Sequence, residues 1–131
     1  MFERIPQEGP LLALLSVGTD DPAETTFPTP AELSLQLGFV VYPAGGEIPR
    51  HDHRPLERHL TGTSEVIVVR SGRCEIDFYD HEREYVATRE LGLGDLVLIV
   101  GGGHGFRMLE DTVLLEVKQG PYTGLDEKER F

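Results

Sequence analysis

EVIVVRSGRCEIDFYD, residues 65–80, decides the fold class, because two strand-like runs stand on either side of a turn. β-Branched and aromatic residues fill both runs, and the Ser-Gly pair at 71–72 is typical of a hairpin turn. In the second run Cys74, Ile76 and Phe78 share one face, and the polar residues between them share the other. We therefore predict a hairpin with one buried face, and a buried, inert thiol at Cys74.

Similar short runs recur along the chain between 15 glycines and 9 prolines. Helical periodicity does not persist, and at most a short helical turn is expected in 30–36 or 124–130. The runs VIVV (66–69) and LVLIV (96–100) are apolar on both faces, so we expect both of their faces to be covered. Strands of this length and spacing predict an all-β sandwich or barrel. The remaining strands are expected at 11–17, 33–42, 85–91 and 95–100, and as a last pair around Asp111 within 106–119.

The composition describes one globular domain of 131 residues, with 39% hydrophobic and 27% charged residues. The net charge of -11 argues against nucleic acid and anionic membranes as partners, and favours a small-molecule ligand or another protein. No apolar run approaches the roughly 20 residues of a membrane helix. The single cysteine cannot form an intrachain disulfide, which suits a reducing compartment. We therefore expect a cytoplasmic protein.

Three histidines and a glutamate form a candidate metal site. On a strand, the i, i+2 spacing of His51 and His53 places both imidazoles on one face, about 6.5–7 Å apart at the backbone. Two such rings can converge on one ion at about 2.0–2.2 Å from each nitrogen. His104, which follows a glycine run after an apolar strand, and Glu65, which begins the next strand, are the natural further ligands. Histidines that only hydrogen-bond to each other in a cavity are the alternative, and we prefer the metal.

Three segments carry a resemblance to a known family. GGEIPRHDH (45–53), the spacing from Glu65 to Gly72, and GDLVLIVGGGHGF (94–106) resemble the two sequence motifs of the cupin superfamily. The resemblance covers residues 36–118 and implies that 1–131 forms a single-domain jelly-roll, or double-stranded β-helix, barrel. It also implies a divalent metal ion in the barrel. The implied ligands are His51, His53, Glu65 and His104, a set that suits Zn, Fe, Ni, Mn or Co.

The chain departs from the family pattern between the first two motif elements. Eleven residues separate His53 from Glu65, where the family has only a few. Glu57 stands at the family spacing, but only Glu65 leads into a strand-like run. We therefore expect an inserted loop at 54–64, and prefer Glu65 over Glu57 as the ligand.

Other polar and aromatic residues around these motifs are candidates for binding a substrate. The arginines could hold a carboxylate or phosphate at the cavity mouth, although each could equally pair with a neighbouring acid at the surface. Alternation leaves open whether Arg107 points inward or outward. Glu116 and Lys118 share one strand face, which we expect to be the solvated one, and His59 and His81 are expected at the surface. The candidate substrate-binding residues are Arg50, Arg54, Arg58, Arg107, Tyr42 and Met108.

These observations favour a metal-dependent enzyme acting on a small molecule, by oxygenase, isomerase or lyase chemistry. A metal-independent sugar-nucleotide isomerase or epimerase of polysaccharide biosynthesis, and a non-catalytic ligand-binding module, remain as alternatives. The sequence assigns no catalytic residue. Residues 1–30 are expected to add an edge strand, 11–17, and a connection. Because exposed edge strands are often covered by a partner subunit, we expect a homodimer.

Overall fold

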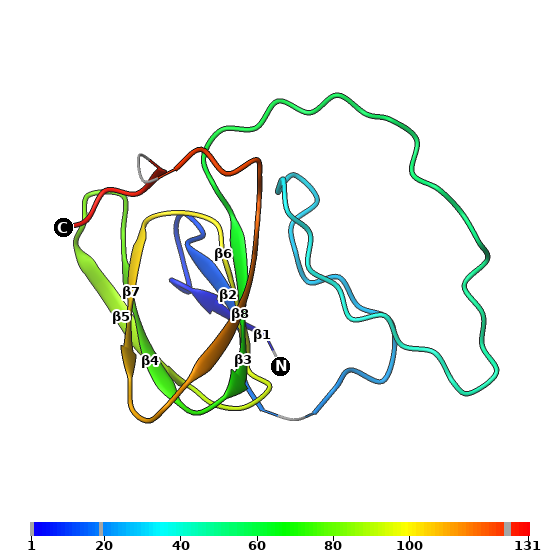
Figure 1. The fold of residues 1–131 in the computed structure, drawn as a ribbon, viewed down its shortest axis with the longest axis horizontal. Coiled ribbons are helices and arrows are strands. Elements are labelled where there is room, and N and C mark those ends of the chain that lie inside the picture. The colour runs from blue at the N-terminus through cyan, green and yellow to red at the C-terminus, as the bar shows by residue number, and fades with distance from the viewer. Residues whose placement is uncertain (1, 19, 125–126) are drawn as a thin grey trace.

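The computed structural model describes residues 2–18, 20–124 and 127–131, and it is all-β (Figure 1). Across these residues it contains no α-helix, and so none long and apolar enough to cross a membrane. The turn expected at 30–36 is a single hydrogen-bonded turn, from the Leu33 N–H to the Pro30 carbonyl. The turn expected at 124–130 includes 125–126, which lie outside the described residues. The strands are β1 (Phe2–Ile5), β2 (Ala13–Ser16), β3 (Glu65–Ser71), β4 (Cys74–Tyr79), β5 (Tyr85–Leu91), β6 (Leu96–Ile99), β7 (Gly103–Met108) and β8 (Val113–Lys118).

The strands form two antiparallel sheets that pack face to face as a β-sandwich. One sheet has the order β1-β2-β6-β3-β8 and the other the order β5-β4-β7. The strand expected at 11–17 is present as β2, but its predicted place at the sheet edge is wrong. β1 pairs with one side of β2 and β6 with the other, so β1 occupies the edge.

The β3–β4 hairpin confirms the prediction from residues 65–80. Gly72 adopts φ +85°, and a Cβ atom there would collide with the Asp111 carbonyl, so the turn requires glycine. Cys74, Ile76 and Phe78 are buried on the inner face of β4, as their alternation indicates. Burial raises the pKa of the Cys74 thiol, with a smaller contribution from Asp95, which suits an inert thiol.

The core lies between the two sheets and draws on nearly every strand. β6 is almost completely buried on both faces, which confirms the prediction for that run. Val66 and Val68 of β3 point to the outer face and are only half-buried. The buried cluster comprises Ile5, Ala13, Leu15, Ile67, Val69, Cys74, Ile76, Phe78, Leu91, Val97 and Ile99.

The strand expected at 33–42 does not form. An isolated bridge between Thr26 and Phe39 is the only β-pairing that the described part of this segment makes. From 42 to 63 every residue is exposed and none belongs to a strand. We call residues 42–63 the arm. An apolar alternation favours a strand, but a strand also needs a neighbour to receive its backbone hydrogen bonds, and 33–42 has such a neighbour only at the Thr26–Phe39 bridge.

The two ends of the segment that carries the arm are fixed to the sandwich. The Gln119 side chain accepts a hydrogen bond from the Ser64 N–H at 3.0 Å and donates one to the Ser34 hydroxyl at 2.9 Å. The Phe39 ring packs 5.6 Å from that of Phe2. Between these attachments the arm loops out beyond the five-stranded sheet, on the side away from the three-stranded sheet (Figure 1).

The sandwich is open along one side, where β7 and β8 are the edge strands of their sheets. On the opposite side the edge strands β1 and β5 are linked by an ion pair in which Arg89 donates to Glu3 at 2.8 Å. Along β7 and β8, by contrast, inward-facing side chains are exposed, including Met108 and Glu116. We call this side the β7–β8 opening.

Candidate functional site

Glu65 and His104 form a close pair at one end of the β7–β8 opening. Glu65 is the first residue of β3, and His104 lies opposite Phe78 in the β4–β7 ladder, so both side chains point between the sheets. His104 Nε2 lies 2.7 Å from Glu65 Oε1, and their side chains are 29% and 10% exposed. The structure thus brings two of the four predicted metal ligands together.

The Glu65 carboxylate is held in its charged form. Its pKa is lowered from 4.5 to about 2, chiefly because the His104 side chain hydrogen-bonds to it. Burial opposes this effect, while a hydrogen bond from Glu116 and the charges of His104 and Lys128 support it. Glu65 is therefore an anion at any physiological pH.

Glu116 is the third member of the site: it faces inward and not outward as expected, although its side chain is exposed at the β7–β8 opening. In the β3–β8 ladder Glu116 pairs with Ile67, and Lys118 pairs with Glu65, so Glu116 and Lys118 face inward. Glu116 is hydrogen-bonded to Glu65, which raises the pKa of Glu116 above its usual value. Two carboxyl groups so close together titrate as a coupled pair, with the pKa of Glu65 lowered and that of Glu116 raised.

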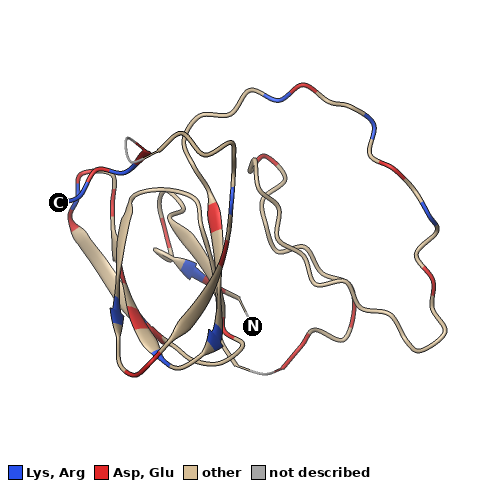
Figure 2. Cartoon of the chain, in the orientation of Figure 1, with Lys and Arg blue, Asp and Glu red and all other residues tan. Residues whose placement is uncertain are grey.

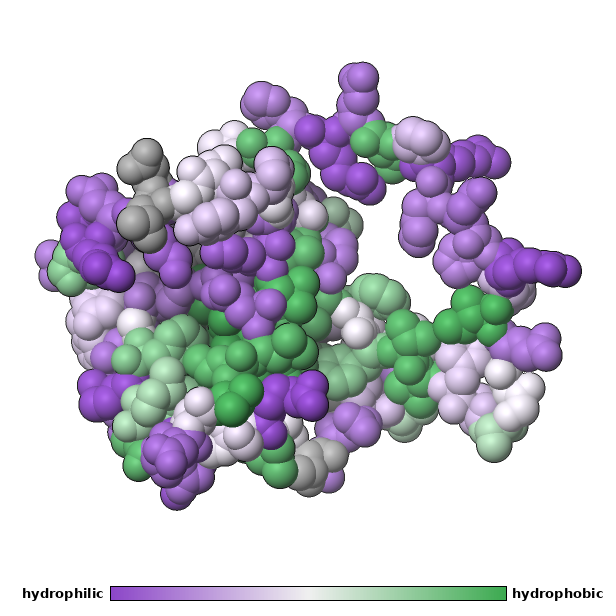
Figure 3. Space-filling model, in the orientation of Figure 1, coloured by the Kyte–Doolittle hydropathy of each residue, from purple (hydrophilic) through white to green (hydrophobic). Residues whose placement is uncertain are grey.

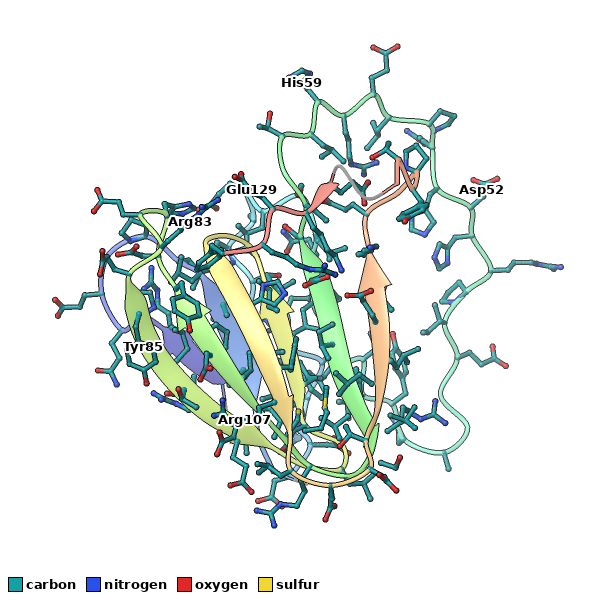
Figure 4. The ribbon with its side chains drawn as sticks, turned by 60° about the vertical axis from the view of Figure 1, so that its left-hand side comes forward. Asp52, His59, Arg83, Tyr85, Arg107 and Glu129 are labelled. Atoms are coloured by element: carbon teal, nitrogen blue, oxygen red, sulfur yellow. The ribbon has the colours of Figure 1, made fainter. Side chains whose placement is uncertain are left out.

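The C-terminal residues 127–131 cross the same end of the sandwich (Figure 4). Arg83 makes an ion pair with Glu129 at 3.1 Å, and the Phe131 ring packs edge-on against Tyr79 at 5.2 Å. Lys128 of this segment is close enough to lower the pKa values of Glu65 and Glu116. The tail therefore adds a positive charge beside the carboxyl pair.

His51 and His53 lie on the arm, away from Glu65 and His104. Their rings stand 5.4 Å apart, and the His51 ring is 2.8 Å from the Pro49 carbonyl through Nδ1. Glu57, the alternative ligand, is also exposed on the arm. Across residues 2–18, 20–124 and 127–131, no three histidine, cysteine or acidic side chains lie close enough together to hold a metal ion.

The predicted substrate-binding residues fall into three places. Arg50, Arg54, Arg58 and Tyr42 are exposed on the arm, where basic and acidic residues alternate (Figure 2). Met108 faces the β7–β8 opening. Arg107 points to the outer face of β7 and makes ion pairs with Glu75 and Asp77 (Figure 4).

The outward direction of Arg107 follows from the register of β7. Arg107 lies opposite Glu75, a position between the buried residues Cys74 and Ile76 of β4. A side chain paired with Glu75 must therefore point away from the core. The two surface histidines are placed as expected, since His59 and His81 are both exposed.

The sequence did contain a signal for Glu116, which was a reversal of polarity along β8. Leu115 and Val117 point outward and are about half exposed, whereas Glu116 and Lys118 point inward. A strand normally turns its apolar set to the core. The reversal indicates a polar interior at this end of the sandwich and an apolar outer surface.

Comparisons of the chain with protein-family models, curated protein sequences and solved structures find no significant match. The functional argument therefore rests on the geometry of Glu65, His104 and Glu116.

Proposed function

We propose that this protein is a cupin-type jelly-roll protein that binds a divalent metal ion at the β7–β8 opening and acts there on a small molecule. The observation that carries the proposal is the Glu65–His104 pair, which offers an anionic oxygen and an imidazole nitrogen 2.7 Å apart. Nitrogen and oxygen donors of this kind suit Zn, Fe(II), Ni, Mn and Co. Glu65 and His104 supply two ligands. A complete site also needs His51 and His53, which an arm (residues 42–63) would have to bring to the β7–β8 opening.

A metal held there would polarise an oxygen atom of the bound molecule. Side chains of this protein would supply the proton chemistry and the charge balance around the metal. The pKa of Glu116 is raised by its hydrogen bond to the Glu65 carboxylate, while Lys118 and Lys128 offset the negative charge. Phe106 packs 5.9 Å from the His104 ring and limits its movement.

The test is metal binding rather than turnover. Protein purified without added metal is expected to contain close to one divalent ion per chain by elemental analysis. His104→Ala and Glu65→Gln are each expected to weaken titrated metal binding by on the order of 10–100-fold, because each removes one ligand. Glu57→Gln is the matched control, since Glu57 is exposed on the arm. Metal-free wild-type protein that takes up no ion on titration would exclude the proposal.

A second function is favoured by the hydrogen bonding of the same residues. If His104 Nε2 donates to Glu65, the neutral ring keeps Nδ1 as a proton acceptor, oriented by a buried carboxylate. The hydrogen bond to Glu65 raises the pKa of Glu116, which would serve as the acid. Such a base and acid need no metal, and they fit an isomerase or epimerase of nucleotide sugars whose diphosphate is bound by arginines.

The two proposed functions predict different behaviour for protein from which a chelator has removed the metal. If the metal-independent function is correct, a nucleotide sugar is expected to raise the Tm of EDTA-treated protein, since it binds the folded state. His104→Ala is expected to abolish that shift. A panel of nucleotide sugars that leaves Tm unchanged, with and without metal, would exclude this second function.

A further inference from the structure

The outer edge of β7 has no strand beside it. β4 is its only strand partner within the described residues, and β8 belongs to the other sheet. An edge with free N–H and C=O groups is a template for adding another strand. Apolar side chains gather around it on the face shown in Figure 3. Those that are exposed on or near β7 and β8 are Met108, Leu109, Val113, Leu115 and Val117.

The arm also lacks a strand partner. Its backbone makes no strand pairing, and Tyr42, Ile48, Leu56 and Leu60 are all exposed. Apolar side chains exposed along a chain segment whose two ends are fixed indicate a covering partner. The arm therefore lacks a neighbour, and β7 lacks one as well.

We propose that residues 46–53 of a second copy of this chain add as a strand to the free edge of β7, and that the two copies exchange their arms reciprocally. The occupant is a second copy because the arm projects beyond the five-stranded sheet, away from its own β7 (Figures 1 and 4). Reciprocal exchange about a twofold axis satisfies both arms and both edges at once.

The alternation of the arm matches the two faces of β7. Arg50 and Asp52 share one face of the added strand, and this face would continue the charged outer row formed by Arg107 with Glu75 and Asp77. The outer row contains both signs of charge, so Arg50 can pair with an acidic residue of the row and Asp52 with Arg107.

The other face of the arm carries His51 and His53, which would point into the β7–β8 opening. That opening contains the buried carboxylate of Glu65 and the Glu116 carboxyl, so imidazoles meet negative charge there. This consequence rests on the proposed metal function, because the partner's histidines would complete the ligand set. The strand exchange itself needs no metal.

The experiment is therefore done in EDTA, so that it does not depend on metal binding. Light scattering after size exclusion is expected to give twice the chain mass of 14.6 kDa. Hydrogen exchange is expected to show protection of both 46–53 and β7. The double substitution Asp52→Pro/His53→Pro removes N–H donors on both edges of the added strand. It is expected to raise the dimer dissociation constant by on the order of 100-fold and to remove the protection.

Glu57→Pro/Arg58→Pro is the matched control, because both residues are exposed on the arm outside the added strand. It is expected to leave the dimer intact. A wild-type monomer would overturn the inference, and a protected arm in that monomer would show that the arm closes on its own chain. A dimer that survives the 52/53 proline pair would overturn it too, and would point to the apolar outer face of β8 as the interface.

Discussion

Replacing His104 with alanine is expected to lower the free energy of unfolding near pH 7 by about 2–4 kcal/mol. Glu65 is a buried carboxylate whose side chain is 10% exposed, and the His104 imidazole is its closest charge-compatible partner. Without His104, the Glu65 carboxylate remains charged between the sheets and has fewer hydrogen-bond donors to stabilise it. The cost is mainly the desolvation of Glu65, which the lost hydrogen bond had offset.

The effect of this substitution should depend on pH. The folded pKa of Glu65 is about 2, below its ordinary value of 4.5. Because the unfolded state takes up its proton first, the stabilisation is complete above pH 4.5 and is lost as the pH falls toward 2. In His104→Ala, burial raises the pKa of Glu65 instead, so the gap between variant and wild type should narrow in acid.

Urea denaturation followed by circular dichroism measures this, since the chain has no tryptophan to report by fluorescence. Glu116→Gln is a control that keeps a donor for Glu65, and it should cost less than about 1 kcal/mol. Adding Glu65→Gln to His104→Ala should recover part of the loss, because no buried charge remains. Two results would contradict the coupling between Glu65 and His104. One is that the effects of His104→Ala and Glu65→Gln on the free energy of unfolding add strictly; the other is that His104→Ala costs the same near pH 7 and near pH 3.5.

The sequence predicted those parts of the fold whose determinants are local. The β3–β4 hairpin needs a glycine at position 72 and alternation along Cys74, Ile76 and Phe78, and both are visible in the sequence. β5 and β6 also formed where apolar runs indicated them. Short-range patterns sufficed for these strands because β3, β4 and β5 follow one another along the chain, and because β6 lies between β2 and β3 and is apolar on both faces.

The failure at 33–42, and the position of His51 and His53, have a different cause. Whether an extended segment becomes a strand depends on a free edge elsewhere in the structure, which no local pattern specifies. The i, i+2 spacing of His51 and His53 is visible in the sequence. The sequence does not show that the arm holds both residues away from Glu65. The same limit applies to Glu116, because alternation shows which residues share a face without showing which face is buried.

Replacing Phe78 with alanine is expected to have the other large effect, a loss of about 3–5 kcal/mol. Phe78 is 1% exposed and lies among the largest buried side chains of the core. Its removal leaves a cavity between the sheets that the surrounding strands can only partly fill. Urea denaturation gives the loss, and Phe27→Ala, at a ring that is 58% exposed, should cost under about 1 kcal/mol.

If Phe78→Ala prevents folding, Ile76→Val on the same face of β4 provides a milder test, with an expected loss of about 0.5–1.5 kcal/mol. The Phe78 variant also connects the core to the site, because Phe78 pairs with His104 across the β4–β7 ladder. A cavity next to His104 frees its ring from the geometry that Glu65 needs, so Phe78→Ala should weaken the proposed metal binding as well as lower stability, whereas Ile76→Val should lower stability alone. Equal losses for Phe78 and Phe27 would mean that the space between the two sheets is not the core of this protein.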